Sequence, residues 1–333
     1  MEYSERFNYR NYIDDQFKSV QHLSAKDVKK LLSELEHLMT ILNQYKTPLE
    51  STYYDHIPEA LLMPLNEFLE YHNLNTVAQI FAPYLSSFGY GRGNETQAYY
   101  AFKAFNVKTI YSFLRGEKLL FIDKGTSDLI NRLSHNISDI RYSIEVTNIE
   151  VIDGKVKIET YYDLDFYDKV LITTKLPRDV IKDDLYNNLM KQIDTNPFVT
   201  CAFEVEDENL VTTYYKANLG QLNKLQFYHP TKANGRTIIV AYAYGKVSKE
   251  LITGITNDIK QTNIKIKHLI GAKQWYIFPH LNKGNLTSDF YKNINKRQES
   301  TPINLIGSLI CEPALSKLYV SVKHSIDKVL ETI

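Results

Sequence analysis

The sequence predicts a mixed α/β (α+β) protein, and three observations support that prediction. Apolar residues recur at helical spacing through roughly the first 110 residues. A central stretch, Leu119–Pro177, has the pattern strand, glycine turn, amphipathic helix, strand, hairpin, strand. After residue 199, β-branched and aromatic runs alternate with short loops, which is typical of an antiparallel sheet.

Bulk composition narrows the class of protein. The 333 residues are 44% hydrophobic and 23% charged, as in soluble globular chains, and the length suggests about two domains. The net charge of zero gives no reason to expect nucleic acid or an anionic membrane as a partner. Two cysteines, a charged start without an apolar core and the lack of any membrane-length apolar run predict a cytoplasmic protein without a transmembrane segment.

The first 115 residues read as helices. Ser24, followed three residues later by Asp27, is a capping pattern that opens a helix reaching Lys46. Pro58 suits the start of a second helix, which Pro64 should kink or divide. Asn94 is the predicted cap of a fourth helix.

A glycine-rich loop, Gly89–Gly93, lies between the third and fourth predicted helices. Its spacing is G-x-G-x-G, whereas the dinucleotide fingerprint is G-x-G-x-x-G and follows a strand. We therefore expect a tight turn between helices rather than a phosphate loop.

The second half is predicted to alternate strands with short helices. A helix is expected over 179–193, and Ser248 opens another that reaches Lys260. Strand-type runs cover 199–205, 224–228, 237–244 and 264–270. A separate segment, Trp275–His280, then precedes a strand at 303–306 and a closing helix from about Ala314 to Leu330.

Five of these pieces together resemble the FAD-dependent amine oxidase and phytoene-desaturase-like oxidoreductases. They are Gly125 with its helix, Glu145–Ile149, Asp168–Thr174 with Pro177 beyond, Trp275–His280 (W-x-x-F-P-H), and Ile306–Leu309 with the closing helix. Their order and spacing agree over roughly residues 118–330. No single piece would support the resemblance alone.

The resemblance implies an incomplete FAD/NAD(P)-binding-type domain beside a helical and antiparallel-sheet substrate domain. Residues 1–115 would form the helical part of the substrate domain and 116–178 the return segment of the FAD domain. Residues 179–274 would form the antiparallel β part of the substrate domain, and 275–333 the C-terminal segment of the FAD domain.

The resemblance also implies the site residues. The cofactor-binding positions would be Val146, Thr173, Thr174, Pro177, Trp275, Gly307, Ser308 and Leu315. The substrate pocket would contain Tyr276, Phe278 and His280. For Trp275, Tyr276 and Phe278, core packing at a domain junction is an equal alternative, and His280 could simply end a strand. No catalytic acid or base is identified, and no H-E-x-x-H motif or Cys/His cluster predicts a metal.

The sequence departs from the family pattern in three places. Ser308 stands where an acidic residue is often found, and Cys311–Leu315 replaces a small-residue approach that these side chains would crowd. The larger departure is the N-terminal βαβ unit that meets the FAD pyrophosphate, which the sequence lacks. We therefore expect FAD either to be lost or to depend on a partner chain that carries this unit.

Two functional hypotheses follow. The first is a truncated or split FAD-dependent oxidoreductase that transfers hydride from a small organic substrate to flavin. The alternative is a non-catalytic remnant that binds a ligand or a partner without flavin. The substrate, the electron acceptor and the oligomeric state are left open.

Overall fold

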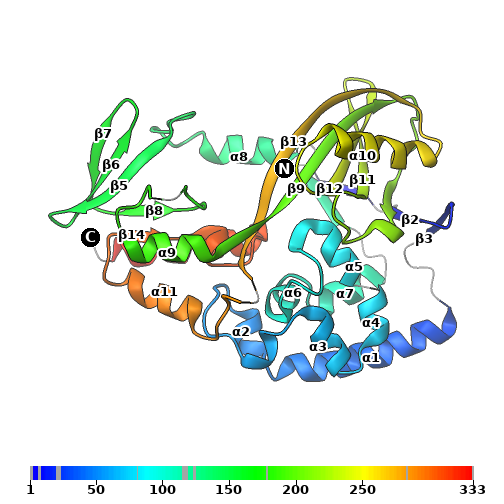
Figure 1. Ribbon diagram of the computed structural model, residues 1–333, viewed down its shortest axis with the longest axis horizontal. Coiled ribbons are helices and arrows are strands. Elements are labelled where there is room, and N and C mark those ends of the chain that lie inside the picture. Colours follow the sequence, from blue (N-terminus) through cyan, green and yellow to red (C-terminus); the bar gives the residue numbers. More distant parts are fainter. Residues whose placement is uncertain are drawn as a thin grey trace.

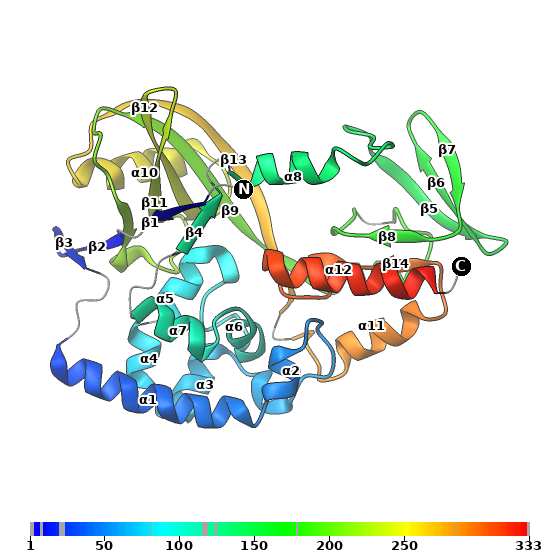
Figure 2. The same ribbon diagram turned by 180° about the vertical axis from the view of Figure 1, so that it is seen from behind.

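The computed structural model describes residues 3–6, 9–19, 24–80, 82–114, 119–122, 125–177, 179–282 and 284–331. Figures 1 and 2 show helices along one side, a curved sheet with α10 at one end, and a smaller group of strands and helices at the other. Two long strands, β9 and β13, run from the curved sheet toward the smaller group (Figure 1). The predicted mixed α/β fold class is confirmed.

The helical layer comes from the first part of the chain. Its elements are α1 (Ala25–Asn43), α2 (Lys46–Glu50), η1 (Glu59–Leu61), α3 (Leu65–Tyr71), α4 (Asn75–Ile80), α5 (Ala82–Leu85), the π-helical η2 (Ser86–Tyr90), α6 (Ala98–Ala104) and α7 (Val107–Leu114). The Ser24 side chain caps α1 by accepting from the Asp27 amide at 3.1 Å, as predicted. Pro58 and Pro64 precede η1 and α3, where a missing N–H costs little. The predicted start at Asn94 is wrong, because Gln97 pairs with Pro64 in an isolated bridge and α6 begins only at Ala98.

The curved sheet has the strand order β13-β9-β12-β11-β10-β2-β3. Its strands are β2 (Tyr9–Ile13), β3 (Gln16–Ser19), β9 (Ile193–Val205), β10 (Thr212–Tyr215), β11 (Leu225–Ala233), β12 (Arg236–Tyr244) and β13 (Ile266–Leu281), with η3 (Lys216–Asn218) after β10. Neighbours are antiparallel except β10 and β2, which are parallel. Helix α10 (Lys249–Gln261) buries Leu251, Ile255 and Ile259 against one face of this sheet.

Strand β13 is longer than the sequence indicated. It joins the predicted strand at 264–270 and the segment Trp275–His280 into one element that pairs with β9. Three register shifts interrupt the ladder, the last between Ile277 and His280, and such bulges bend a strand.

The smaller group contains the central stretch and the C-terminal part. Its elements are β5 (Val146–Ile152), β6 (Lys155–Thr160), β7 (Leu164–Tyr167), β8 (Val170–Ile172), α8 (Gly125–Ser134), α9 (Asp184–Gln192), α11 (Phe290–Gln298), β14 (Ile303–Leu305), η4 (Gly307–Leu309) and α12 (Leu315–Leu330). Strands β5, β6 and β7 form an antiparallel sheet, and β8 and β14 form a parallel pair. A further pair joins β1 (Tyr3–Arg6) to β4 (Leu119–Ile122).

The element order predicted for Leu119–Pro177 is confirmed where the structure describes it, except that a further strand, β7, lies between the hairpin and β8. Gly125 has a φ of +79°, which a glycine adopts without strain, and α8 begins there. Residues 123 and 124, and the expected domain boundary between 115 and 116, lie outside the described residues.

Candidate functional site

The carboxyl ends of two adjacent parallel strands form the centre of the candidate site. Thr173 follows β8 and Gly307 follows β14, and the Ile306 amide donates to the Ile172 carbonyl at 2.9 Å. Gly307 has a φ of +69°, and a Cβ added there would lie 3.9 Å from the Thr173 carbonyl oxygen. In open α/β sheets, ligands bind beyond the carboxyl ends of parallel strands.

The start of α12 follows this point directly. Ala314, at its N-cap, makes no side-chain hydrogen bond to the first turn. A helix N-terminus without a side-chain cap presents N–H groups and the positive end of the helix dipole. Leu315, the first residue of α12, is 54% exposed.

Six of the eight sequence-predicted cofactor residues lie in three places, and the other two, Trp275 and Leu315, lie in β13 and α12. Gly307 is buried and Ser308 half-buried in η4, while Thr173, Thr174 and Pro177 are exposed after β8. Val146 is half-buried at the start of β5, in the separate antiparallel sheet. Of these residues, the geometry brings Thr173 and Gly307 directly together.

Trp275 and Tyr276 lie on opposite faces of β13. Trp275 is 40% exposed, pairs with Phe198 and donates from Nε1 to Thr200 Oγ1 at 2.9 Å. The Lys273 ammonium lies 4.0 Å from the centroid of the indole ring. Tyr276, opposite Pro197, is 63% exposed.

Phe278 and His280 lie at the last bulge of β13 and are buried. Phe278 has a φ of +54°, a strained value for a non-glycine residue of the kind found at functional sites. Its ring stacks on His280 at 4.8 Å and contacts Tyr90 at 4.9 Å and Tyr100 at 5.5 Å. Burial lowers the pKa of His280, which favours the neutral imidazole, and its Nδ1 lies 2.7 Å from the Phe278 carbonyl oxygen.

Two titratable groups near this bulge, the half-buried Tyr90 and the buried Glu312, were not singled out from the sequence. Burial, with a smaller effect of the Glu312 charge, raises the pKa of Tyr90 to about 12. Burial also raises the pKa of Glu312, against the effects of Lys317 and Lys103. Tyr90 belongs to the glycine-rich loop Gly89–Gly93, and the glycine content of this loop is the feature of the sequence that could have drawn attention to Tyr90.

The segment Cys311–Leu315 is placed differently from the sequence-based expectation. Cys311 pairs with Tyr53 in an isolated bridge, and the Tyr54 amide donates to the Ile310 carbonyl at 2.9 Å. Cys311 and Glu312 are therefore buried against the helical layer. Of this segment, Leu315 has an exposed side chain at the start of α12.

The glycine-rich loop is a tight turn between η2 and α6, as predicted. A Cβ at Gly89 would lie 2.0 Å from Ile277 Cδ1, so the turn packs directly against β13. The Gly89 carbonyl accepts from Asn196 Nδ2 at 2.8 Å, and the Gly91 amide donates to the Tyr244 hydroxyl at 2.9 Å. These two hydrogen bonds attach the turn to β9 and β12 of the curved sheet.

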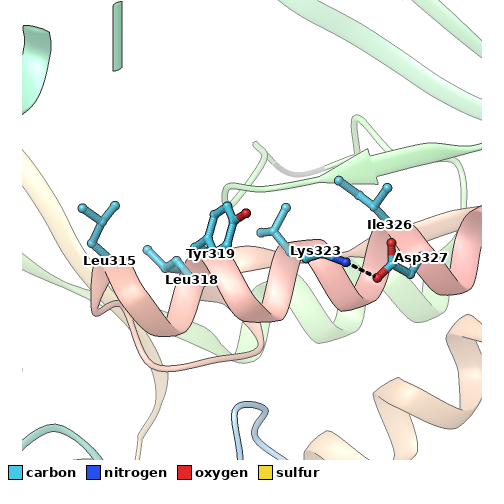
Figure 3. Close-up of a pocket in the computed structure, with 7 residues that line it drawn as sticks. Leu315, Leu318, Tyr319, Lys323, Ile326 and Asp327 are labelled. Carbon is cyan, nitrogen blue, oxygen red and sulfur yellow. Dashed lines mark hydrogen bonds and ion pairs between the residues drawn. The ribbon is translucent and has the colours of Figure 1, made fainter. Parts of the chain in front are cut away.

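An apolar groove runs along α12. It measures about 430 Å³ and is lined by Leu315, Leu318, Tyr319, Val322, Lys323, Ile326 and Asp327. Figure 3 shows these side chains along the helix, with Lys323 and Asp327 paired at 2.8 Å. Exposed apolar side chains also occur on α8 (Ile130, Leu133) and on β7 (Leu164, Phe166).

Within the part of the chain that the structure describes, no group of three or more His, Cys, Asp or Glu residues could hold a metal ion. Among the same residues, no helix combines the length and apolar character needed to cross a membrane.

Solved structures share this fold. The chain is similar to a CLA-producing fatty acid isomerase from P. acnes, with 18% identity, a TM-score of 0.88, and coverage of 99% of this chain and 80% of that one. It is also similar to a putrescine oxidase redesigned in cofactor binding (8% identity, TM-score 0.71, 100% and 83% covered). A cyclohexylamine oxidase from Brevibacterium oxydans gives 10% identity, a TM-score of 0.62, and 92% and 76% coverage.

These likenesses show the fold: the chain has the mixed α/β architecture of FAD-binding amine-oxidase-like proteins. No family model and no curated protein matches the sequence.

Proposed function

We propose that this protein is a FAD-dependent oxidoreductase of the amine-oxidase-like class, acting on a small organic substrate. The observation that carries the proposal is the meeting of Thr173 and Gly307 at the ends of β8 and β14, just before the uncapped N-terminus of α12. The flavin, when bound, supplies the acceptor for a hydride from the substrate.

The described residues fit the flavin side of such a cofactor. Gly307 combines a positive φ with space that a larger side chain would fill, so the cofactor can approach the backbone. In this proposal Thr173, Thr174, Pro177, Ser308, Trp275 and Leu315 line the cofactor, and Val146 lies at its adenine end. The four-segment division of the chain, at 115/116, 178/179 and 274/275, belongs to the same proposal.

The bulge of β13 would form the substrate side. Phe278, with Tyr90 and Tyr100 behind it, gives an apolar wall that excludes water. His280, kept neutral by burial, would offer a hydrogen bond without adding a charge. Tyr276 would lie at the outer edge of this pocket.

The pyrophosphate of FAD needs a further α/β unit, which we propose docks on α12. Parallel strands normally belong to sheets that are buried on both faces and connected through helices. In the described part of the chain, β8 and β14 form a sheet of only two strands. The apolar groove of α12 would receive the unit, supplied either by a partner chain or by sequence outside these 333 residues.

The absorbance of the purified protein tests the proposal. We expect this chain to be colourless alone and to give a yellow, flavin-containing complex when co-expressed with the reading frame immediately upstream. Flavin bound one-to-one by this chain alone would contradict the requirement for a further unit. If neither preparation binds FAD, even when it is added in excess, the oxidoreductase proposal fails.

A glycine variant makes the test specific for the site. Gly307→Val should reduce flavin occupancy of the complex, because the branched side chain occupies the space beside the Thr173 carbonyl. Gly235→Val is the matched control: Gly235 also has a positive φ, and a Cβ there meets no atom within 4 Å. Equal flavin occupancy in the two variants would remove Gly307 from the cofactor site.

A further inference from the structure

The Tyr100 side chain contacts three residues at the last bulge of β13. Its ring meets Phe278 edge-on, with centroids 5.5 Å apart and an interplanar angle of 88°, and lies 6.2 Å from the ring of His280. Its hydroxyl accepts a hydrogen bond from the Leu281 amide at 3.1 Å. Tyr100 belongs to α6 of the helical layer and is 1% exposed, so a buried side chain from another part of the fold holds this end of β13.

The bond to Leu281 meets a need that arises from the position of the strand. In the described part of the chain, β13 is the last strand of the curved sheet and has its ladder partner, β9, on one side only. N–H groups on the outer side of an edge strand have no ladder partner. Because Leu281 is fully buried, its amide needs another acceptor, and the Tyr100 hydroxyl supplies it.

Tyr291 of α11 fixes the Tyr100 hydroxyl in turn. The two hydroxyl oxygens are 2.7 Å apart, and both side chains are 1% exposed. The ring of Tyr54 packs against both, at 5.3 Å from the ring of Tyr100 and 4.8 Å from that of Tyr291. Three segments that are distant in the sequence therefore meet at this hydroxyl pair: α6, α11 and the end of β13.

The bulge needs such support because its backbone is strained. Phe278 has a φ of +54°, and conformations of this kind persist only where the surroundings over-determine them. Besides Tyr100, the rings of His280 at 4.8 Å and Tyr90 at 4.9 Å pack on Phe278. Tyr100 adds a hydrogen bond to the backbone of β13, so it restrains both the Phe278 ring and the strand that carries it.

The conformation of the bulge determines which nitrogen of His280 is free. Nδ1 lies 2.7 Å from the Phe278 carbonyl oxygen, and a carbonyl can only accept a hydrogen bond. A neutral imidazole at this position must therefore carry its hydrogen on Nδ1, which leaves the lone pair on Nε2. None of the described residues bonds to Nε2, although the His280 side chain is only 9% exposed.

Burial and nearby charges together set the protonation of His280. Burial has the largest effect and lowers its pKa, and the charge of Lys175 acts in the same direction. The hydrogen bond to the Phe278 carbonyl and the charges of Asp194 and Glu95 raise it. The net result is a lowered pKa, so the ring is neutral near pH 7 and Nε2 can accept a hydrogen bond.

We propose that Tyr100 and Tyr291 are positioning residues that hold the Nε2 lone pair of His280 available to a ligand that donates a hydrogen bond. The hydroxyl pair fixes the end of the strand through Leu281, the strand fixes the bulge at Phe278, and the bulge fixes the tautomer. This inference rests on the proposed function only in calling the place a substrate pocket.

Nuclear magnetic resonance of the flavin-free chain tests the proposal. The protein is labelled with 15N at histidine, and the His280→Gln variant identifies the His280 signals among the nine histidines. In the wild type we expect a single neutral tautomer with its hydrogen on Nδ1. Tyr100→Phe leaves the buried Leu281 amide without its acceptor, so the strand end should move. His280 should then populate both tautomers, and its pKa should rise toward the ordinary value of 6.5.

Two further variants separate positioning from a general loss of stability. Tyr291→Phe keeps the bond to Leu281 but removes the hydroxyl that orients Tyr100, so it should give the same change to a smaller extent. Tyr186→Phe is the matched control: Tyr186 is fully buried in α9 and its hydroxyl donates to the Ile303 carbonyl. It should destabilise the chain in urea and leave the His280 signals unchanged.

Each outcome decides the proposal. A wild-type tautomer with its hydrogen on Nε2, or unchanged His280 signals in every folded variant of Tyr100→Phe and Tyr291→Phe, would overturn it. An equal change in Tyr186→Phe would also overturn it, because the effect would then follow from loosening of the core. The measurements use no flavin, so they can fail while the protein takes up FAD and can succeed in a preparation that never does.

Discussion

The Tyr244 hydroxyl accepts a hydrogen bond from the Gly91 amide at 2.9 Å and donates to the Ser86 carbonyl. Tyr244 ends β12, and the two backbone groups belong to the glycine-rich turn and to η2. A single buried hydroxyl thus joins the sheet to the turn that carries Tyr90. Because Tyr90 packs on Phe278, this contact also positions the candidate substrate pocket.

Replacing Tyr244 with Phe tests this link. The ring remains, but the buried Gly91 amide loses its partner, so we expect the free energy of unfolding to fall by about 1–3 kcal/mol. Urea unfolding of the variant measures the change. Tyr71→Phe, at an exposed position, should unfold at the wild-type midpoint. Coincident midpoints for Tyr244→Phe and the wild type would show that the hydrogen bonds contribute nothing.

Alanine substitutions at Gly89 and Gly235 distinguish the stability cost of backbone strain from the cost of overpacking. Both have a positive φ, but a Cβ at Gly89 would lie 2.0 Å from Ile277 Cδ1, whereas a Cβ at Gly235 meets nothing within 4 Å. Gly235→Ala should therefore cost about 1–2 kcal/mol from strain alone. Gly89→Ala adds overpacking of about 1–3 kcal/mol. Thermal unfolding of both variants gives the comparison, and equal losses would rule out a packing role for Gly89.

Local patterns predicted most elements of this fold. Ser24 and Asp27 form the cap that the sequence indicated, and the predicted order of elements in Leu119–Pro177 is the one observed apart from the additional strand β7. These features depend on neighbours within a few residues. Asn94 failed as a helix cap because a distant contact, the bridge between Pro64 and Gln97, fixes where α6 begins.

The candidate site depended on long-range contacts that no local pattern contains. The bulge that gives Phe278 its left-handed conformation comes from the pairing of β13 with β9, whose paired residues His280 and Asp194 are 86 positions apart in the sequence (280 − 194). Tyr90 and Glu312 reach the same region from opposite parts of the chain. The stacking of Tyr214, Phe227 and Tyr242 on neighbouring strands likewise follows from strand register, which their spacing in the sequence does not reveal.

Lys103 predicts a pH dependence of stability. Its ammonium donates to the carbonyls of Pro48 at 2.9 Å and Ser51 at 2.7 Å, and burial lowers its pKa from 10.5 to about 8. Between these two values the unfolded chain holds a proton that the folded chain has lost. The contribution of Lys103 to stability therefore rises with pH through this range, and below pH 8 its buried charge is a cost.

Lys103→Met removes this contribution. The difference in unfolding free energy between wild type and variant should grow in favour of the wild type from about pH 7.5 to 9.5. Lys216, whose pKa burial also lowers to about 8, is present in both proteins and cancels in the difference. A difference independent of pH would show that Lys103 titrates alike in the folded and unfolded chains.

The exposed apolar face of α12 predicts dye binding and self-association of the isolated chain. Leu315 is 54% and Tyr319 70% exposed, and both line the groove of Figure 3. The double variant Leu315→Lys/Tyr319→Lys should therefore bind less anilinonaphthalene sulfonate and elute later in size exclusion. Tyr71→Lys, at an equally exposed tyrosine on α3, should change neither measurement.

The same pair of variants tests what covers α12. If an α/β unit docks there, the double variant should also lose the co-expressed partner, whereas Tyr71→Lys should retain it. A wild-type chain that is monomeric and silent to the dye would contradict the docking surface, because an apolar groove of this size in contact with water should bind the dye.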